Sequence, residues 1–364
     1  MIVLKLRLNK VFEFNDFEID FTYPKKVVNS IIEEEHLAGR ERFRYKKAVI
    51  LMGANATGKT SLGRVLSLVF LTFKDMNPRY LFPIMKEEGA FLSIDFVNNE
   101  YRLQRFTAKI VDGGSALDYH YYSSDIDAMD SYEKCVKKLQ DHSDLFDKHE
   151  NDDELIGKFK CRFSYPEIQE SLSLAGIDKA TLLNTFRAVI GTLDPSLKNI
   201  EIAKELKDSF IIRRRDQEII IQEGKLLNRE LLSSGTVEGI DVAIFLASML
   251  SKEPCFYYCD EHFSYIQSDI EKRIFGIMLD RIPENGQLIF TTHNTDMLDL
   301  NLPKHTFVFL RKALEDGEWK VSAVSASDYL KRNTDSVRAA VENDVFGALP
   351  NDSLLDELET GVEK

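Results

Sequence analysis

The sequence predicts an α/β protein, because apolar strand-like runs repeatedly end in glycine-rich or polar residues and give way to helical patterns. The run AVILM at residues 48–52 leads into GANATGKT, and an apolar helical pattern follows between Leu62 and Phe70. Two later runs, CFYYCDEH and GQLIFTTH, also begin as apolar strands and end in polar side chains. With 364 residues and 44% apolar content, the chain can form a substantial core.

The other segments show distinct local patterns. The N-terminus, MIVLKLRLNKVFEF, alternates like a strand and does not resemble a signal peptide. FLSIDFVNNEYRLQRFTAKIV predicts an antiparallel hairpin around Asn98 and Asn99, whereas residues 125–206 are mostly helical in pattern. The helix signals there are a capping box at Ser164 and Glu167, an N-cap at Asp178 and a stop at Asp194 and Pro195. SFIIRRR and EIIIQ predict two further strands.

GANATGKT fits the P-loop pattern G-x-x-x-x-G-K-[ST]. In that motif backbone N–H groups surround a polyphosphate, the lysine meets the outer phosphates and the hydroxyl ligates Mg²⁺. The stretch lies between a predicted buried strand and a helix N-terminus, where the helix dipole favours anions, so a turn without a ligand is the weaker interpretation. The expected nucleotide-binding residues are Gly53, Asn55, Ala56, Thr57, Gly58, Lys59, Thr60 and Ser61.

Three further polar groups lie where a phosphate-binding site needs them. Asp260 and Glu261 end the strand-like run CFYYCDEH, and adjacent strand residues face opposite ways, so one carboxylate can face Mg²⁺ and the other an attacking water. His293 ends GQLIFTTH, and the cluster SSGT at 233–236 precedes an apolar helix. Singly, these are also explained by a surface pair, a structural histidine and a helix cap. Together they favour one site at the carboxyl ends of the strands.

The formal net charge of -13 argues against strong nonspecific binding of duplex DNA by the whole surface. A local basic groove is still compatible with it, although a solvated face explains such runs equally. The candidate basic residues are Arg40, Arg42, Arg44, Lys46 and Lys47, and a second group at Arg213, Arg214 and Arg215.

Other chemistry is less well supported by the sequence. No apolar run reaches the roughly 18 residues that a membrane span needs, so we expect a cytoplasmic protein without a membrane partner. Cys255 and Cys259 lie in a strand-like run, about 13 Å apart, which favours core packing over a zinc site. The cluster Asp125, Asp127 and Asp130 lacks the glycine and closing glutamate of a calcium loop.

In its combined motifs the sequence resembles the ABC-type ATPase superfamily. The Walker A motif corresponds to residues 53–60, the signature to LSSGT at 232–236, Walker B to 256–260 with Glu261 as the catalytic glutamate, and the switch histidine to His293. The GxNxxGKT loop, the strand-rich N-terminus and the spacing between motifs resemble the soluble branch that contains SMC, RecF and the overcoming-lysogenization-defect proteins. Within it the chain looks similar to stand-alone phage-defence ATPases of the RloA and AbiLi kind.

This resemblance implies a P-loop NTPase sheet sandwiched by helices, with an antiparallel β subdomain and a helical insertion. The implied segments are an ATPase lobe at 1–120, a mainly helical insertion at 121–227, a second ATPase lobe at 228–312 and a C-terminal segment with an acidic tail at 313–364.

The resemblance also implies a mechanism that uses ATP and Mg²⁺. Lys59 would neutralise the β- and γ-phosphates, and Thr60 with Asp260 would hold Mg²⁺. Glu261 would polarise water and His293 would sense the γ-phosphate. The signature residues Ser233, Ser234 and Gly235 would reach ATP on another copy of the chain, so a complete site needs at least a dimer.

Several features depart from the superfamily pattern. Ser234 replaces a glycine of the signature, and HFSYIQSD after Glu261 matches only loosely the loop that usually crosses the dimer interface. Thr236 stands where glutamine, glutamate or lysine often follows, and the usual Q-loop glutamine cannot be placed, since Gln104 reads as a strand residue. No nuclease motif is present, so the leading hypothesis is an ATP-driven regulator of a separate nuclease or toxin in anti-phage defence. The alternatives are a RecF- or SMC-like ATPase that binds DNA for repair, a transporter subunit and an inactive nucleotide-dependent scaffold.

Overall fold

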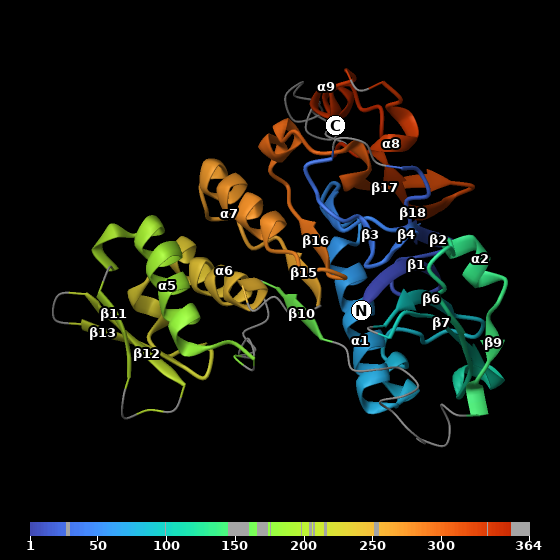
Figure 1. The fold of residues 1–364 in the computed structure, drawn as a ribbon, viewed down its shortest axis with the longest axis horizontal. Coiled ribbons are helices and arrows are strands. Elements are labelled where there is room, and N and C mark those ends of the chain that lie inside the picture. The colour runs from blue at the N-terminus through green and yellow to red at the C-terminus, as the bar shows by residue number, and fades with distance from the viewer. Residues whose placement is uncertain are drawn as a thin grey trace, which may run out of the picture.

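A six-stranded sheet forms the centre of the protein in the computed structural model, with the order β10-β15-β16-β5-β17-β18 (Figure 1). All neighbouring strands are parallel except the last pair, β17 and β18. The strands are β10 (Cys161–Ser164), β15 (Phe256–Asp260), β16 (Gln287–Thr291), β5 (Ala48–Met52), β17 (Phe307–Glu315) and β18 (Glu318–Ser325). Every residue of β5, β15 and β16 is buried, as expected for parallel strands covered on both faces. The predicted α/β fold is confirmed.

The structure describes residues 1–26, 30–98, 100–144, 160–165, 174, 176–197, 199–203, 206, 208–214, 217–250, 255–332 and 334–350. Some residues named above, Asn99, Glu167, Arg215 and the acidic tail after Asp352, lie outside this part of the chain.

One face of the central sheet is covered by helix α1 (Lys59–Asp75), which a second, antiparallel sheet covers in turn (Figure 1). The strands of this second sheet are, in spatial order, β2 (Phe17–Asp20), β1 (Ile2–Asn9), β6 (Phe91–Val97), β7 (Arg102–Val111), β8 (Ala116–Asp125) and β9 (Gln140–Asp141). Leu66 of α1 shares one core cluster with Leu6 of β1 and Leu51 of β5. The predicted N-terminal strand and the β6–β7 hairpin are confirmed. A short hairpin of β3 (His36–Leu37) and β4 (Arg40–Arg44) leads into β5.

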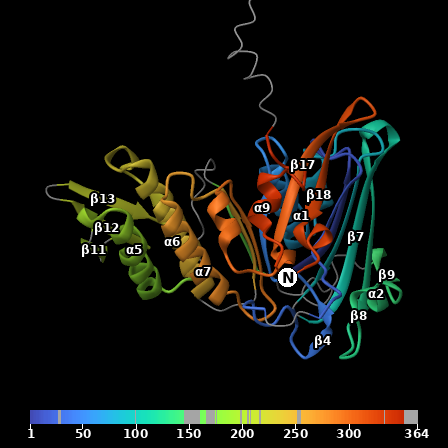
Figure 2. The same cartoon turned by 90° about the horizontal axis from the view of Figure 1, so that it is seen from above.

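The opposite face of the central sheet is covered by α6 (Ser234–Leu250) and α7 (Ser268–Asp280). Helix α5 (Lys179–Leu193) lies against α6, and a four-stranded antiparallel sheet covers α5, so that these elements follow one another in Figure 2. That sheet contains β11 (Asn199–Ile202), β12 (Ser209–Arg214), β13 (Gln217–Gln222) and β14 (Lys225–Leu226). Asp178 caps α5 as predicted, because its carboxylate accepts hydrogen bonds from the backbone N–H groups of Ala180 and Thr181 at 2.8 and 3.2 Å.

Two expectations about the middle of the chain are corrected. The described part of residues 121–227 is not mainly helical, since it contains β10 to β14 beside α5 and the short α2 (Tyr132–Val136). Ser164 does not begin a helix, because it ends strand β10, and β10 belongs to the central sheet through its parallel pairing with β15. The central sheet therefore takes one strand from the middle segment, and β17 runs across the boundary expected at residue 313.

Short helical segments complete the described chain. The remaining α-helices are α8 (Ala326–Tyr329) and α9 (Val337–Glu342), and the 3-10 segments are η1 (Pro78–Leu81), η2 (Asp112–Gly114), η3 (Pro195–Leu197), η4 (Arg229–Leu231), η5 (Thr295–Asp299) and η6 (Lys304–Thr306). Within the residues that the structure describes, no helix combines the length and the apolar character that crossing a bilayer requires.

Helix α1 approaches β15 closely at Gly63. A Cβ atom there would lie 2.5 Å from Cε1 of Tyr258, a ring that is fully buried. We expect Gly63→Ala to lower the free energy of unfolding by about 1–3 kcal/mol, because overpacking outweighs the better helix propensity of alanine. Gly276→Ala in α7 is the matched control, since nothing lies within 4 Å of its Cβ position and the change should stabilise by up to about 1 kcal/mol. Chemical denaturation checks both signs, and equal effects of the two changes would contradict the packing argument.

Candidate functional site

The loop between β5 and α1 has a backbone that few side chains allow. Ala56 and Gly58 have φ values of 60° and 94°, in the left-handed region. A Cβ atom on Gly58 would lie 2.8 Å from Oε1 of Glu13, and one on Gly53 would lie 2.4 Å from the carbonyl oxygen of Leu310. The loop therefore needs glycine at both motif positions and leads directly into the N-terminus of α1, a geometry suited to a polyphosphate.

Lys59 is the first residue of α1, and its buried ammonium group points back into the loop. Its Nζ donates hydrogen bonds to the carbonyl oxygens of Gly53 and Ala54 at 2.8 and 3.1 Å, and lies 3.4 Å from Oε1 of Glu261. Burial lowers the pKa of Lys59, and the nearby Glu261 carboxylate opposes that shift. The Tyr258 hydroxyl donates to the Lys59 carbonyl oxygen at 2.5 Å, so strand β15 fixes the start of the helix.

Thr60 and Asp260 meet across the site, although they lie far apart in the sequence. The Thr60 hydroxyl donates to Oδ2 of Asp260 at 2.7 Å, and the Thr291 hydroxyl donates to Oδ1 at the same distance. Burial raises the pKa of Asp260, and the two hydroxyl hydrogen bonds only partly oppose this shift. A carboxylate and a hydroxyl oxygen in contact are hard ligands that fit a Mg²⁺ ion shared with phosphates. Among the described residues, no group of three or more histidine, cysteine and carboxylate side chains is arranged to hold a metal ion.

Glu261 links the loop to His293. Its Oε1 lies 3.4 Å from Lys59 Nζ and 2.9 Å from Nε2 of His293. Burial acts to raise the pKa of Glu261, but the hydrogen bond with His293 and the charge of Lys59 prevail, so the pKa is lowered. This carboxylate is therefore held between two nitrogen groups that favour its ionised form.

The expectation that Asp260 and Glu261 face opposite ways as adjacent strand residues is wrong. Strand β15 ends at Asp260, and Glu261 has a φ of 49°, which is rare for a residue with a side chain. The turn brings both carboxylates to the start of α1, where Asp260 contacts Thr60 and Glu261 contacts Lys59. Backbone strain of this kind persists where surrounding contacts hold it, and here the Glu261 N–H donates to the carbonyl and hydroxyl oxygens of Thr291 at 3.2 and 3.0 Å.

The segment 233–236 forms the beginning of α6, and the side-chain hydrogen bonds of Ser233 and Thr236 join these two residues to each other. The Ser233 hydroxyl accepts a hydrogen bond from the Thr236 N–H at 3.2 Å and lies 2.8 Å from the Thr236 hydroxyl. Thr236 is buried, which explains a small hydroxyl residue at this position, whereas Ser233 and Ser234 are exposed. Further along α6, Glu238 accepts from the N–H of Tyr265 at 2.9 Å.

Sequence reasoning missed the residues that flank His293. Thr291 ends β16 and donates to Asp260, while Thr292 and Asn294 flank His293 in the loop that follows and both donate hydrogen bonds to Glu271 of α7. The run TTHN was a usable signal, because four polar residues follow a buried strand. A cavity of about 360 Å³ lies beside this loop, and its lining includes Glu261, Glu271, Thr292, His293 and Asn294.

The first basic stretch is largely occupied by contacts within the protein. Lys46 and Lys47 are buried and donate to the carbonyl oxygens of Asp20 and Glu33 at 2.9 and 3.0 Å. Arg40 lies 3.8 Å above the ring of Tyr101.

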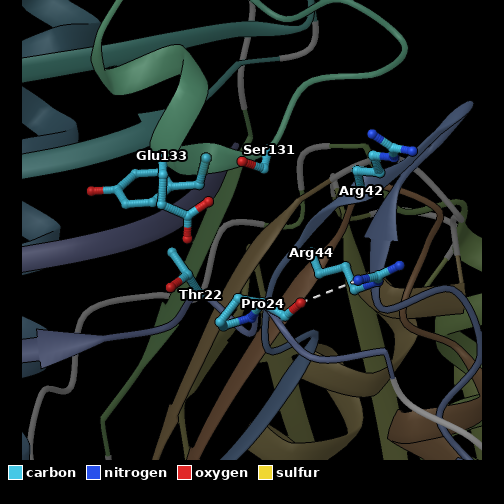
Figure 3. A pocket seen from close by; sticks show the side chains of 7 residues that line it. Thr22, Pro24, Arg42, Arg44, Ser131 and Glu133 are labelled. Atoms are coloured by element: carbon cyan, nitrogen blue, oxygen red, sulfur yellow. Dashed lines mark hydrogen bonds between the residues drawn. The ribbon is translucent and has the colours of Figure 1, made fainter.

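Arg42 and Arg44 line a separate cavity of about 300 Å³ between β4 and the start of α2 (Figure 3). Glu133 lines the same cavity, and Arg44 donates to the Pro24 carbonyl oxygen at 3.2 Å. In the second basic stretch, Arg213 pairs with Glu201 and Glu218. Of the two basic stretches, Lys46, Lys47 and Arg213 are therefore engaged by groups of the protein itself.

The remaining candidate residues, the acidic cluster, the two cysteines and Gln104, lie in structural contacts. Lys138 lies 2.9 Å from Asp127 and 2.6 Å from Asp130. Cys255 and Cys259 are buried free thiols, as predicted. Gln104 lies within β7, the strand position that the sequence indicated.

Comparisons with solved structures found distant similarities to SMC head domains. The SMC head domain of Thermotoga maritima is 15% identical, with a TM-score of 0.40, over 89% of this chain and 99% of that one. An SMC head bound to the C-terminal winged-helix domain of ScpA is 13% identical, with a TM-score of 0.48, over 91% and 100%. The SMC head with an extended coiled coil, bound to the C-terminal domain of ScpA from Pyrococcus furiosus, is 12% identical, with a TM-score of 0.47, over 91% and 98%.

No protein-family profile and no curated protein sequence matches the chain.

Proposed function

We propose that this protein is an ATPase of the ABC type that binds MgATP at the loop between β5 and α1. One observation supports this proposal above all: side chains from three separate parts of the sequence, all of types suited to phosphate chemistry, meet in the folded chain. They are Lys59, Thr60, Asp260, Glu261 and His293. A flexible turn without a ligand would not require these partners.

Each residue has a role that its contacts permit. Lys59 places a positive charge beside the loop carbonyls, and Thr60 with Asp260 supplies oxygen ligands for Mg²⁺. When bound, Mg²⁺ neutralises phosphate charge. Glu261, whose pKa is lowered by His293 and Lys59, can orient a water and accept its proton, while His293 holds the carboxylate and can donate to a phosphate oxygen. Positioning and charge compensation supply most of the acceleration in phosphoryl transfer.

The signature residues support a site shared between two copies of the chain. Ser233 and Ser234 are exposed at the N-terminus of a long helix, and the neighbouring Tyr265 is 71% exposed. We infer that Ser233, Ser234 and Gly235 bind the γ-phosphate of ATP held by a second copy, so that ATP binding assembles at least a dimer.

The ATPase cycle is proposed to regulate a separate effector, a nuclease or toxin, in bacterial anti-phage defence. The resemblance of the motif set supports this role, together with a sequence that has no nuclease motif. DNA repair of the RecF or SMC kind is the alternative. It receives less support, because Lys46 and Lys47 are buried and Arg213 is paired with carboxylates. Strongly salt-dependent binding of duplex DNA would favour the alternative.

Turnover of ATP by wild type and Lys59→Met tests the proposal. Wild type should bind ATP and hydrolyse it only with Mg²⁺. Lys59→Met should weaken nucleotide binding by about 10- to 100-fold, because a buried charged donor is lost, and should reduce hydrolysis to background. Lys74→Met is the matched control, since Lys74 is an exposed residue of the same helix. A wild type that binds no ATP, or a Lys59 variant as active as wild type, would refute the proposal.

A further inference from the structure

The loop that carries His293 is fastened on both sides of the histidine. Immediately before it, the Thr292 hydroxyl donates to Oε1 of Glu271 at 2.7 Å. Immediately after it, the Asn294 side-chain amide donates to Oε2 of the same carboxylate at 2.6 Å. One carboxylate of α7 therefore holds the two residues that flank the histidine.

Glu271 is buried to a degree that is unusual for a carboxylate. It is 2% exposed, and burial raises its pKa although the hydrogen bonds from Asn294 and Thr292 oppose the shift. A buried carboxylate costs folding free energy unless its hydrogen bonds are satisfied. Both carboxylate oxygens of Glu271 accept hydrogen bonds from the His293 loop. The buried carboxylate therefore fixes the position of this loop.

The position of the His293 side chain depends on these hydrogen bonds, because the side chain itself is only partly packed against the protein. Its side chain is 41% exposed and borders the cavity of about 360 Å³, yet its Nε2 must stay 2.9 Å from Oε1 of Glu261. We propose that Glu271 is a positioning residue that holds the His293 loop so that the imidazole stays bonded to the catalytic carboxylate. The consequence for turnover rests on the proposed ATPase function.

A second set of contacts holds the same loop from the surface. Ser268 accepts from the Asn294 amide at 2.9 Å and donates to Asp296 at 2.6 Å, and Arg338 of α9 lies 3.1 Å from Asp296. These contacts are more exposed than those of Glu271 and contribute less, because exposed ion pairs are screened by water. Glu271 is thus the main anchor.

Steady-state turnover of Glu271→Ala and Glu271→Gln tests this assignment. Glu271→Ala should lower kcat by about 10- to 100-fold with KM within about threefold. Glu271→Gln should restore kcat to within about threefold of wild type, since its amide can accept from Asn294 and donate to the Thr292 hydroxyl. Adding Glu271→Ala to His293→Ala should cause no further loss. Asp269→Ala, a 93% exposed acid on the same helix, is the control and should match wild type.

Three results would overturn the assignment: an unchanged kcat in Glu271→Ala, an effect of this change on KM alone, or a kcat of the double variant that is lowered by the product of the two single losses. If Glu271→Ala fails to fold, Thr292→Val removes one of the two contacts without loss of volume and should lower kcat in the same way. The side-chain NMR signal of His293 gives a readout that needs no turnover. Its imidazole signal should shift in Glu271→Ala and stay in place in Glu271→Gln. A wild type without ATPase activity would refute the proposed function, while this signal would still decide the role of Glu271.

Discussion

Replacing Glu261 by glutamine is expected to slow ATP hydrolysis by about 100-fold or more while ATP binding stays within about threefold of wild type. Glutamine has the same shape but cannot accept a proton from water, and it removes the negative charge held between Lys59 and His293. The groups proposed to hold the nucleotide, Lys59 and Thr60, are unchanged.

Phosphate release and binding of a fluorescent ATP analogue measure the two effects of Glu261→Gln separately. Glu284→Gln, an exposed change in the loop before β16, is the control and should hydrolyse ATP as wild type does. Turnover within about threefold of wild type in Glu261→Gln would mean that another group activates the water.

Replacing Asp260 by asparagine should abolish Mg²⁺-dependent turnover and yet raise Tm by about 1–3 °C. Asparagine keeps hydrogen bonds with Thr60 and Thr291 but is a poor ligand for Mg²⁺. Because burial raises the pKa of Asp260, its contribution to stability is complete below the ordinary pKa of an aspartate and is lost as pH rises through the raised value. The neutral amide avoids that loss at neutral pH.

Thermal unfolding at pH 7.5 in EDTA measures the stability effect of Asp260→Asn. Glu261→Gln is an informative companion, because the pKa of Glu261 is lowered and its ionised form stabilises the fold above the ordinary pKa of a glutamate. The two neutralising changes should therefore shift Tm in opposite directions. A lower Tm in Asp260→Asn would contradict the argument that burial of the ionised Asp260 carboxylate costs folding free energy.

Local patterns predicted the elements that carry the site. The apolar run 48–52, the glycines of GANATGKT and the helical spacing after Thr60 gave a strand, a loop and a helix in the right order, because each pattern reflects the backbone of its own segment. The same holds for the N-cap at Asp178 and for the β6–β7 hairpin.

Such local patterns did not predict contacts between residues that are far apart in the sequence. Nothing in CRFS indicates that β10 pairs with β15, because that pairing depends on the path of the intervening chain. The left-handed backbone of Glu261 also escaped prediction, since an apolar run cannot show where its strand ends. Glu271 lies in the first turn of α7, where acidic residues are common, and only the fold places it beside the loop of His293.

The mass of Glu261→Gln in solution, with and without MgATP, tests most directly whether two copies share the nucleotide. A variant that binds ATP without hydrolysing it should stay assembled. Its mass should therefore reach at least twice that of one chain with MgATP and fall in EDTA. Adding Ser234→Arg, which places a bulky cation at the exposed end of α6, should prevent this assembly. A mass that stays at one chain with saturating MgATP, in a variant shown to bind ATP, would contradict the shared site.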